Sequence, residues 1–307
     1  MNYLVTGAAG FIGSCIAQKL LDAGHHVLTI DNLSTGYKES IPNNCEFIYG
    51  DVADKKSIEK LNNQKFDAII HMAGQSSGEA SFDDPIYDLN SNTSSTLMLL
   101  NYAVRVKCKR FVYASTMSVY GEQTGKERFS EIDIVKPKSL YAVGKLASEH
   151  YLKIYQEQYG IIYTALRYFN VYGPGQNLYN LKQGIVSIYL KQFIDDDFKK
   201  VEVKGSLNRF RDLSYIDDVV DVSVNIINNR NSYNEIINIG TGRKVCINTM
   251  LSLMKKYLQS SKKVFVSNET PGDQFGIYAN TDKLQTIYSK NFIDFSVGIR
   301  KMIEKIK

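Results

Sequence analysis

The sequence predicts a doubly wound parallel α/β sheet with a second, smaller α/β lobe. Short apolar runs alternate with amphipathic stretches through the first third of the chain, which implies parallel strands joined by right-handed helical crossovers. Beyond Gly173-Pro174-Gly175 the pattern loosens, and glycine, asparagine and charged residues become frequent. The 307 residues, 44% hydrophobic and 22% charged, have ordinary folded composition and are enough for about two domains.

Each expected element follows from its local pattern. The first helix, for example, carries Ile12, Ile16 and Leu20 on one side, as a helix packed on a sheet does. The expected strands cover residues 3–5, 27–30, 47–49, 68–71, 110–114, 162–166 and 236–239. The expected helices cover residues 11–23, 94–106, 139–159, 185–193, 217–228, 248–258 and 295–306.

Composition excludes several classes of protein. Lys and Arg total 37 and Asp and Glu total 32, so the net charge of +5 is mild for this length and does not indicate nucleic-acid binding. No apolar run reaches the roughly 18 residues that span a bilayer, and no leader precedes the first strand, so we expect a cytoplasmic protein. Neither a zinc site nor a disulfide framework is indicated, because no CxxC spacing occurs among Cys15, Cys45, Cys108 and Cys246.

A glycine-rich run joins the first expected strand to the first expected helix. Residues 6–13, TGAAGFIG, have GxxGxxG spacing. Gly7 permits a tight turn, Gly10 lets the backbone approach a pyrophosphate, and Gly13 allows close helix–strand packing. The helix N-terminus then offers free N–H groups to phosphates. An isolated run of this kind also occurs as an ordinary strand–helix turn, so its context decides.

That context is a series of polar residues at the ends of the following strands. Asp31 ends the second expected strand, close to the roughly 20-residue offset of a ribose-binding acid. Its carboxylate accepts ribose hydroxyls and repels a 2′-phosphate, which favours NAD over NADP. Asp51-Val52 is expected at the adenine edge, and Met72-Ala73-Gly74 at the pyrophosphate and adjoining ribose.

A Tyr and a Lys four residues apart form the candidate catalytic pair. Tyr141 and Lys145 share one face of the expected helix 139–159. A free Tyr has a pKa near 10, and a Lys cation together with an oxidised nicotinamide favours its phenolate. Thr116 follows the fifth strand and is expected to hydrogen-bond the substrate oxygen. Isolated YxxxK spacing is common, and helix or turn capping is the ordinary role of Ser115, Thr116 and Ser118.

Taken together, these motifs resemble those of a known superfamily. TGAAGFIGS, DNLSTG, the Asp51 turn, HMAG, ASTMSVYG, YAVGK, RYFNVYGPG and RDLSYIDDVVD occur in the order typical of extended short-chain dehydrogenases/reductases. The chain looks most like NAD-dependent sugar-nucleotide epimerases of the UDP-glucose 4-epimerase type, over nearly its whole length. The resemblance implies a Rossmann-type NAD-binding domain at 1–168, with about 212–242 returning to it, and a substrate-binding lobe at 169–211 and 243–307.

The resemblance also implies roles for individual residues. The catalytic residues are Thr116, Tyr141 and Lys145. The cofactor contacts are Gly7, Gly10, Phe11, Ile12, Asp31, Asn32, Asp51, Val52, Ala73, Gly74 and Asn90, together with Tyr141 and Lys145. The substrate contacts are Thr116, Asn170 at a phosphate, Arg211 at the diphosphate, Asp273 at the ribose, and Ile277 near the sugar. An Arg suits the diphosphate because its planar fork pairs with phosphate oxygens.

The implied reaction is epimerisation of a nucleotide-linked hexose, a UDP-hexose at C4, through a transient 4-keto sugar and without a metal. Tyr141 takes the proton of the 4-hydroxyl while C4 gives hydride to NAD⁺, and the hydride returns to the other face of the sugar. Family members usually dimerise through two helices of each subunit, so the resemblance implies a homodimer in which 94–106 and 139–159 form a four-helix bundle.

Several positions depart from the family pattern. Related dehydratases carry Asp-Glu after the catalytic Thr, and related decarboxylases need a Glu at the second of those places, whereas this chain has Met117 and Ser118. Thr270 stands where many 4-epimerases have a phosphate-binding Arg, so nucleotide binding is expected to be either weaker or supplied by Arg209 or Lys204. Ser76 stands where the best-known members have a Lys. Ile277 stands where a large Tyr excludes N-acetyl sugars in some members, so acetylated sugars are expected to fit.

Two other functions compete with epimerisation. A dehydratase or reductase of the same fold has the same cofactor site, and a reductase consumes or releases NADH. A non-catalytic dinucleotide-binding protein shares the fold, but such proteins usually lose the Tyr–Lys pair, which Tyr141 and Lys145 retain.

Overall fold

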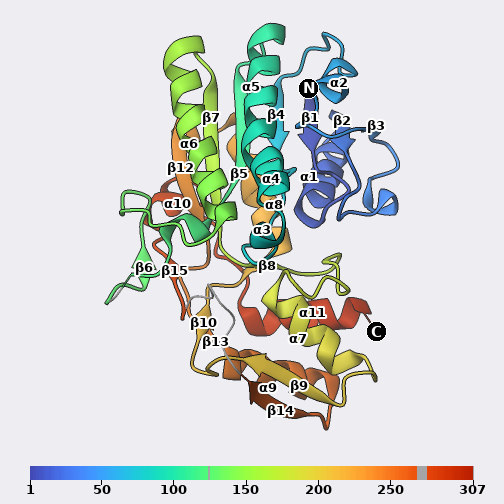
Figure 1. Cartoon of the computed structure of the whole chain (residues 1–307), viewed down its shortest axis with the longest axis vertical. Coiled ribbons are helices and arrows are strands. Elements are labelled where there is room, and N and C mark those ends of the chain that lie inside the picture. The colour runs from blue at the N-terminus through green and yellow to red at the C-terminus, as the bar shows by residue number, and fades with distance from the viewer. Residues whose placement is uncertain (124, 268–274, 307) are drawn as a thin grey trace.

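Seven parallel strands form the central sheet of the computed structural model, which describes residues 1–123, 125–267 and 275–306. Their order is β12-β7-β5-β4-β1-β2-β3, and the order reverses between β4 and β1, where a crevice opens at the carboxyl ends of the strands. The strands are β1 (Asn2–Thr6), β2 (His26–Asp31), β3 (Glu46–Tyr49), β4 (Ala68–His71), β5 (Arg110–Thr116), β7 (Ile162–Tyr168) and β12 (Glu235–Ile239) (Figure 1).

Helices cover both faces of this sheet because successive strand residues point to opposite sides. Tyr3 and Val5 join one buried core with α1 and α8, whereas Leu4 joins the other with α2, α5 and α6. The sheet therefore has a double apolar core, the signature of a doubly wound fold, and the predicted fold class is confirmed. The helices of this layer are α1 (Phe11–Asp22), α2 (Lys55–Glu59), α5 (Ser95–Val106), α6 (Leu140–Tyr159) and α8 (Ile216–Asn225).

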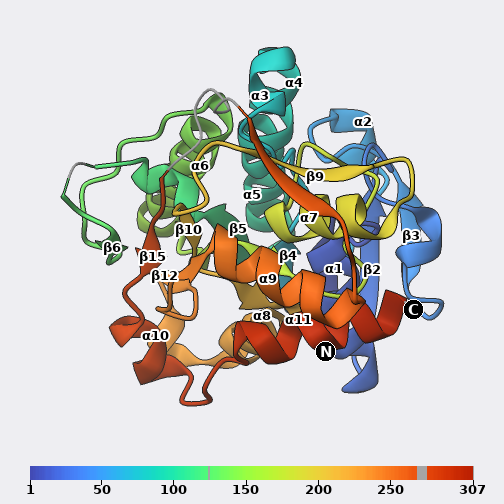
Figure 2. The ribbon, with the colours of Figure 1, turned by 90° about the horizontal axis from the view of Figure 1, so that it is seen from below.

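The second lobe lies below the sheet, at the carboxyl ends of its strands (Figures 1 and 2). It shares the core of α1 and α8, because buried residues of α7, α9 and α11 belong to the same cluster. Its helices are α7 (Ile185–Ile194), α9 (Ile247–Leu258) and α11 (Phe295–Ile306). Two-stranded pairings complete it, among them β9 (Lys200–Lys204) with β14 (Lys263–Ser267), and β10 (Phe210–Arg211) with β13 (Val245–Cys246).

The structure contains short elements that the sequence pattern did not predict. A π-helical turn, Asn90–Ser94, joins α4 to α5, so the helix expected at 94–106 is the end of a longer helical run. Segment 212–242 contains β12, which pairs with β7 in the large sheet. The sequence pattern also did not predict α2, β9, β10, β13 and β14. Further unpredicted elements are α3 (Ala80–Asp83), α4 (Pro85–Leu89), α10 (Asp282–Ile287), β6 (Arg128–Phe129), β8 (Val171–Tyr172), β11 (Ser214–Tyr215) and β15 (Tyr278–Ala279). Among the described residues, no helix is long and apolar enough to cross a membrane.

Candidate functional site

A cavity of about 210 Å³ opens at the carboxyl ends of β1, β2 and β4. Ten of the predicted cofactor residues line it: Gly7, Gly10, Phe11, Ile12, Asp31, Asn32, Asp51, Val52, Ala73 and Gly74. Of the other three predicted cofactor residues, Tyr141 and Lys145 do not line it, and neither does Asn90. Its side chain accepts a hydrogen bond from Ser94 within the π-helical turn, whereas the neighbouring Ser91 faces the cavity.

The glycine run gives this cavity an open helix N-terminus. Gly7 has a φ of +75°, and a Cβ there would lie 2.6 Å from the backbone nitrogen of Ala73. A Cβ on Gly13 would overlap the carbonyl oxygen of Gly7, so helix α1 approaches β1 only because both residues are glycine. Gly10 caps α1 without a side-chain hydrogen bond, and the first turn of α1 carries no acid. Its N–H groups therefore suit a phosphate.

Asp31 sits at the far rim of the same cavity. Its carboxylate accepts the backbone N–H groups of Ala9 at 3.0 Å and Leu33 at 2.8 Å, which fixes its orientation. Asn32 donates to Asp51 at 2.9 Å, so the two acidic residues form one ordered edge. Among the described residues no Lys or Arg lines this cavity. An acceptor for ribose hydroxyls without a cation for a 2′-phosphate fits NAD rather than NADP.

Thr116, Tyr141 and Lys145 come together below the ends of β5 and α6. Thr116 ends β5, and its hydroxyl accepts the Ser118 N–H at 3.1 Å. Ser139 caps α6 by accepting the Ala142 N–H at 3.2 Å, which puts Tyr141 in the first turn and Lys145 one turn later. The Thr116 hydroxyl is near enough to Tyr141 to lower the pKa of its phenol. All three side chains are buried.

Burial sets the protonation of this pair. It raises the pKa of Tyr141 to about 12, against the effect of the Thr116 hydroxyl, which lowers it. Burial also lowers the pKa of Lys145 to about 8, and the nearby Asp88 carboxylate opposes that shift. The Lys145 ammonium lies 5.9 Å from the Tyr141 ring centre and 5.0 Å from that of Tyr113. Burial therefore favours the neutral phenol of Tyr141, whereas the expected effect of a Lys cation and an oxidised nicotinamide is to favour its phenolate.

Asp88 is a buried partner that the sequence interpretation missed. Its carboxylate accepts the side-chain amides of Gln75 and Asn92, each at 3.0 Å. Burial raises its pKa, whereas Lys145 lowers it. The other end of the Asn92 amide has no partner among the described residues. The available signal was an Asp in a helical, polar stretch, which is usually a solvated position.

A buried ion pair anchors α6 beside the strands that carry the site. Arg167 of β7 donates to Glu149 of α6 through two bonds of 2.9 and 2.7 Å, and both side chains are at most 3% exposed. Ser115 of β5 donates to the same carboxylate at 2.5 Å. Because Ser115 precedes Thr116, and Glu149 lies two turns after Tyr141, this pair fixes the spacing between those two side chains.

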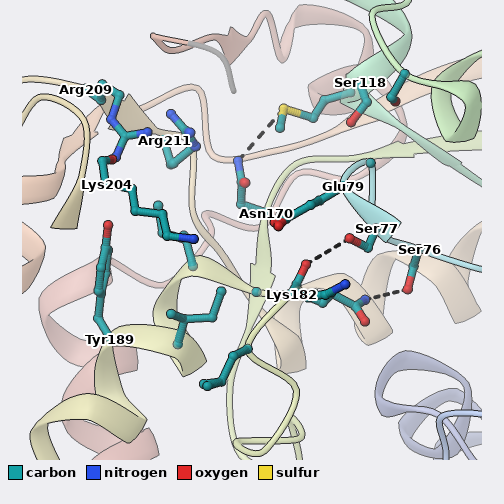
Figure 3. Close-up of a pocket in the computed structure, with 18 of the residues that line it drawn as sticks. Ser76, Ser77, Glu79, Ser118, Asn170, Lys182, Tyr189, Lys204, Arg209 and Arg211 are labelled. Atoms are coloured by element: carbon teal, nitrogen blue, oxygen red, sulfur yellow. Dashed lines mark hydrogen bonds between the residues drawn. The ribbon is translucent and has the colours of Figure 1, made fainter. Parts of the chain in front are cut away.

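A second cavity, of about 380 Å³, lies between the sheet ends and the second lobe (Figure 3). Met117, Ser118 and Ser139 line it on the side of Thr116 and Tyr141, although those two residues do not line it themselves. The predicted substrate residues Asn170 and Arg211 line it, as do the suggested replacement cations Lys204 and Arg209. The predicted ribose contact Asp273 and the departure at Thr270 lie outside the described residues.

The guanidinium groups of this cavity are held close together. Burial lowers the pKa of Arg211 to about 10, and the neighbouring Arg209 charge lowers it further. Arg211 donates to the Phe210 carbonyl at 2.8 Å, and Asn170 donates to the Asp212 carbonyl at 3.0 Å. Adjacent buried cations of this kind repel one another, so a polyanion such as a diphosphate is favoured between them.

Ile277 does not face either cavity. It is 1% exposed and packs in a core cluster with Val119, Tyr120, Phe129, Phe169 and Ala279. Ile277 is therefore not part of the cavity wall, so its small size does not by itself make room for an acetyl group. Any influence on the sugar pocket passes through its neighbours in that cluster.

The two cavities meet at a hydrogen-bonded pair. Ser76 and Gln183 line both of them, and the Gln183 amide donates to the Ser76 hydroxyl at 2.5 Å. Ser76 follows β4, and Gln183 belongs to the segment that leads into α7. Within the described residues, no group of three or more His, Cys, Asp or Glu side chains is arranged to hold a metal ion.

A doubly wound sheet with a glycine-turn crevice at its switch point and a buried Tyr–Lys pair defines a short-chain dehydrogenase/reductase of the extended type. Comparison with known families makes this specific. The model of the NAD dependent epimerase/dehydratase family matches residues 3–240. The chain belongs to this family, and NAD is its cofactor.

Individual relatives agree with the family assignment. A putative UDP-glucose 4-epimerase of Methanocaldococcus jannaschii is 32% identical over 99% of this chain and 98% of its own length. A UDP-glucuronate 4-epimerase of Thermodesulfobacterium geofontis is 29% identical over 98% and 94%. Thermotoga maritima UDP-glucose 4-epimerase with UDP-glucose superposes with a TM-score of 0.95 at 31% identity, covering 100% of this chain and 98% of that one. The Thermus thermophilus enzyme with NAD gives 0.92 at 32%, covering 99% and 98%.

Proposed function

We propose that the protein interconverts the C4 epimers of a nucleotide-linked hexose, a UDP-hexose in the first place. The observation that carries the proposal is that the surroundings of the Tyr141–Lys145 pair reach both cavities. Its neighbour Ser139 lines the sugar-nucleotide cavity, and the Lys145 ammonium lies 3.1 Å from a Cβ built on Gly74, which lines the cofactor cavity. A proton-transferring group there can reach the 4-hydroxyl oxygen of a sugar whose C4 also faces the cofactor.

In this mechanism the chain supplies proton transfer, orientation and exclusion of water. NAD, when bound in its oxidised form, supplies the redox chemistry at C4 and a positive charge that favours the Tyr141 phenolate. Thr116 holds the sugar 4-hydroxyl, and Tyr141 accepts its proton. Its raised pKa favours this acceptance by the phenolate. Tyr141 then returns the proton to the oxygen of the 4-keto sugar. Rotation of the 4-keto sugar between the two steps inverts C4.

The residues after Thr116 argue against the alternative reactions of this family. Met117 and Ser118 line the substrate cavity, and neither side chain is an acid–base group at neutral pH. Dehydration needs a proton donor and acceptor at C5 and C6, and we propose that this site has none there. Epimerisation needs only the proton transfer at the C4 oxygen.

The substrate is held by its diphosphate in this proposal. Arg211 and Asn170 contact the phosphates, with Lys204 and Arg209 as further cations on the same cavity wall. Their positive charge supplies what an Arg at Thr270 supplies in many relatives. The sugar then extends toward Ser118 and Ser139, and Asp273 remains the proposed ribose contact.

A panel of UDP-, GDP- and dTDP-hexoses tests the proposal, with products identified by mass spectrometry and NMR. We expect a C4 epimer of unchanged mass and no lasting absorbance of NADH. The Tyr141→Phe variant is expected to lose activity by about 10²–10⁴-fold, because it lacks the proton-transferring hydroxyl. Tyr159→Phe, on the same helix but half exposed, is the matched control. Loss of water or carbon dioxide from the sugar, or full activity of Tyr141→Phe, would refute the proposal.

We also propose a homodimer built on α5 and α6. The two helices lie side by side (Figure 1), and Val143 and Ile154 of α6 are each 50% exposed. A symmetric copy that covers them forms a four-helix bundle. Light scattering is expected to give a dimer mass, and Ile154→Asp to give a monomer, whereas Ile132→Asp on an exposed loop leaves the dimer intact. A monomeric mass for the unchanged protein contradicts the proposal.

A further inference from the structure

Charge is divided unevenly along the second cavity. Figure 3 shows Lys204, Arg209 and Arg211 together on one side, and Glu79 on the other side, between Asn170 and Ser77. The first group suits a diphosphate, as argued above. Glu79 therefore lies next to the part of the substrate that extends beyond the diphosphate.

That part is the sugar. Ser118 and Ser139 border the cavity next to Thr116 and Tyr141, which the proposed reaction places at C4. Gly78 lies against the same place, since a Cβ on it would be 3.3 Å from the Ser139 hydroxyl. Glu79 directly follows Gly78, and its exposed side chain also lines the cavity, so it enters the cavity next to this sugar end.

The cations at the sugar end are already paired. Lys182 lies 2.7 Å from Asp83, and Lys138 lies 3.3 Å from Glu122. The pKa of Lys182 is raised first by its hydrogen bond to Asp83, and Glu79 adds only a smaller effect. Glu79 itself has no ion pair within the described ranges. The sugar end thus carries one carboxylate in excess.

From this arrangement we infer that the site takes hexoses without a charge at C6 and rejects hexuronates, and that Glu79 is the residue that rejects them. The inference rests on the proposed function and on the same cavity. A hexuronate carries its carboxylate at C6, two bonds from C4, and so brings a second negative charge to this end. A like charge in the protein can exclude the hexuronate without altering any contact to the uncharged hexose.

Near a protein surface, with an effective dielectric constant of about 40, two like unit charges about 6 Å apart repel each other. This repulsion raises the dissociation constant roughly tenfold. We therefore expect UDP-glucose to bind at least about tenfold more tightly than UDP-glucuronate. Glu79→Gln keeps the shape of the side chain and removes the charge. It is expected to strengthen UDP-glucuronate binding about tenfold while leaving UDP-glucose binding within about twofold.

The test measures the dissociation constants of UDP-glucose and UDP-glucuronate by calorimetry, and kcat/KM for each, in the unchanged protein, in Glu79→Gln and in Glu59→Gln. Glu59→Gln is the matched control, since it removes the same charge from an exposed site on α2 that borders neither cavity. Added salt should reduce the ratio of the UDP-glucuronate to the UDP-glucose dissociation constant in the unchanged protein. It should not change this ratio in Glu79→Gln.

Equal or tighter binding of UDP-glucuronate by the unchanged protein overturns the inference. So does an equal effect of Glu79→Gln on both ligands, or the same effect from Glu59→Gln. Selective binding without turnover of either sugar leaves the inference standing and refutes the proposed function. If neither ligand binds, both are refuted.

Discussion

Replacing Arg167 by Met leaves a buried carboxylate without its partner. Arg167 and Glu149 are 3% and 2% exposed, and two hydrogen bonds of 2.9 and 2.7 Å join them. After the change, the remaining bond to Glu149 comes from Ser115 at 2.5 Å. A single hydroxyl cannot offset the desolvation of an ionised carboxylate, so breaking such a pair costs about 3–5 kcal/mol of the free energy of unfolding.

Urea titration followed by circular dichroism measures this loss. Arg300→Met is the control, since Arg300 forms an exposed i,i+4 pair with Glu304 and its removal should cost less than about 0.5 kcal/mol. The double variant Glu149→Gln, Arg167→Met should recover part of the stability, because it removes the unpaired charge. A loss below about 1 kcal/mol for Arg167→Met, or no recovery in the double variant, would show that the pair does not anchor α6 as argued.

Three further predictions concern the cofactor cavity and the buried Lys145 beside it. Burial lowers the Lys145 pKa to about 8, below the unfolded value near 10.4, so the unfolded chain binds more protons between these values and stability rises with pH there by up to about 3 kcal/mol. Lys145→Met should lack that rise, and identical pH profiles of unfolding free energy would contradict the assignment. Asp31→Ala should weaken NAD binding by about tenfold or more in a fluorescence titration, because it removes the ribose acceptor; unchanged affinity would place the ribose elsewhere. Gly7→Ala should abolish NAD retention on purification, since its Cβ would meet Ala73 at 2.6 Å, and a variant that keeps its NAD would show that the turn can shift.

The large sheet was predictable because its strands are short apolar runs, and because these runs alternate with amphipathic helices along the sequence. The expected strand at 68–71 is β4 itself, fully buried on both faces. Strands β9 and β14 were not predicted. Lys200–Lys204 alternates cleanly, but it pairs with Lys263–Ser267, which is exposed along most of its length and carries no such pattern. Pairings of two residues, such as β8 with β11, leave no periodic signal at all.

In the candidate site, too, some residues could be predicted from the sequence and others could not. Residues fixed by a local motif, such as Gly7 and Asp31, were found because the chemistry of the motif requires them at that spacing. Asp212 was named only as part of a motif, yet its buried carboxylate accepts the N–H groups of Thr241, Gly242 and Ala279 at 2.8–3.0 Å and so joins three segments behind the substrate cavity. Partners so far apart in sequence follow from tertiary contacts that a single sequence does not display.

The central claim is that the hydrogen of C4 leaves and returns without exchange with water. UDP-glucose deuterated at C4 tests it most directly, with the UDP-galactose product examined by NMR and mass spectrometry in ordinary water. The mechanism predicts that the product keeps deuterium at C4 and gains none of the solvent's hydrogen there. Loss of the deuterium to solvent, or inversion at another carbon with C4 untouched, would contradict the roles proposed for Thr116, Tyr141 and NAD.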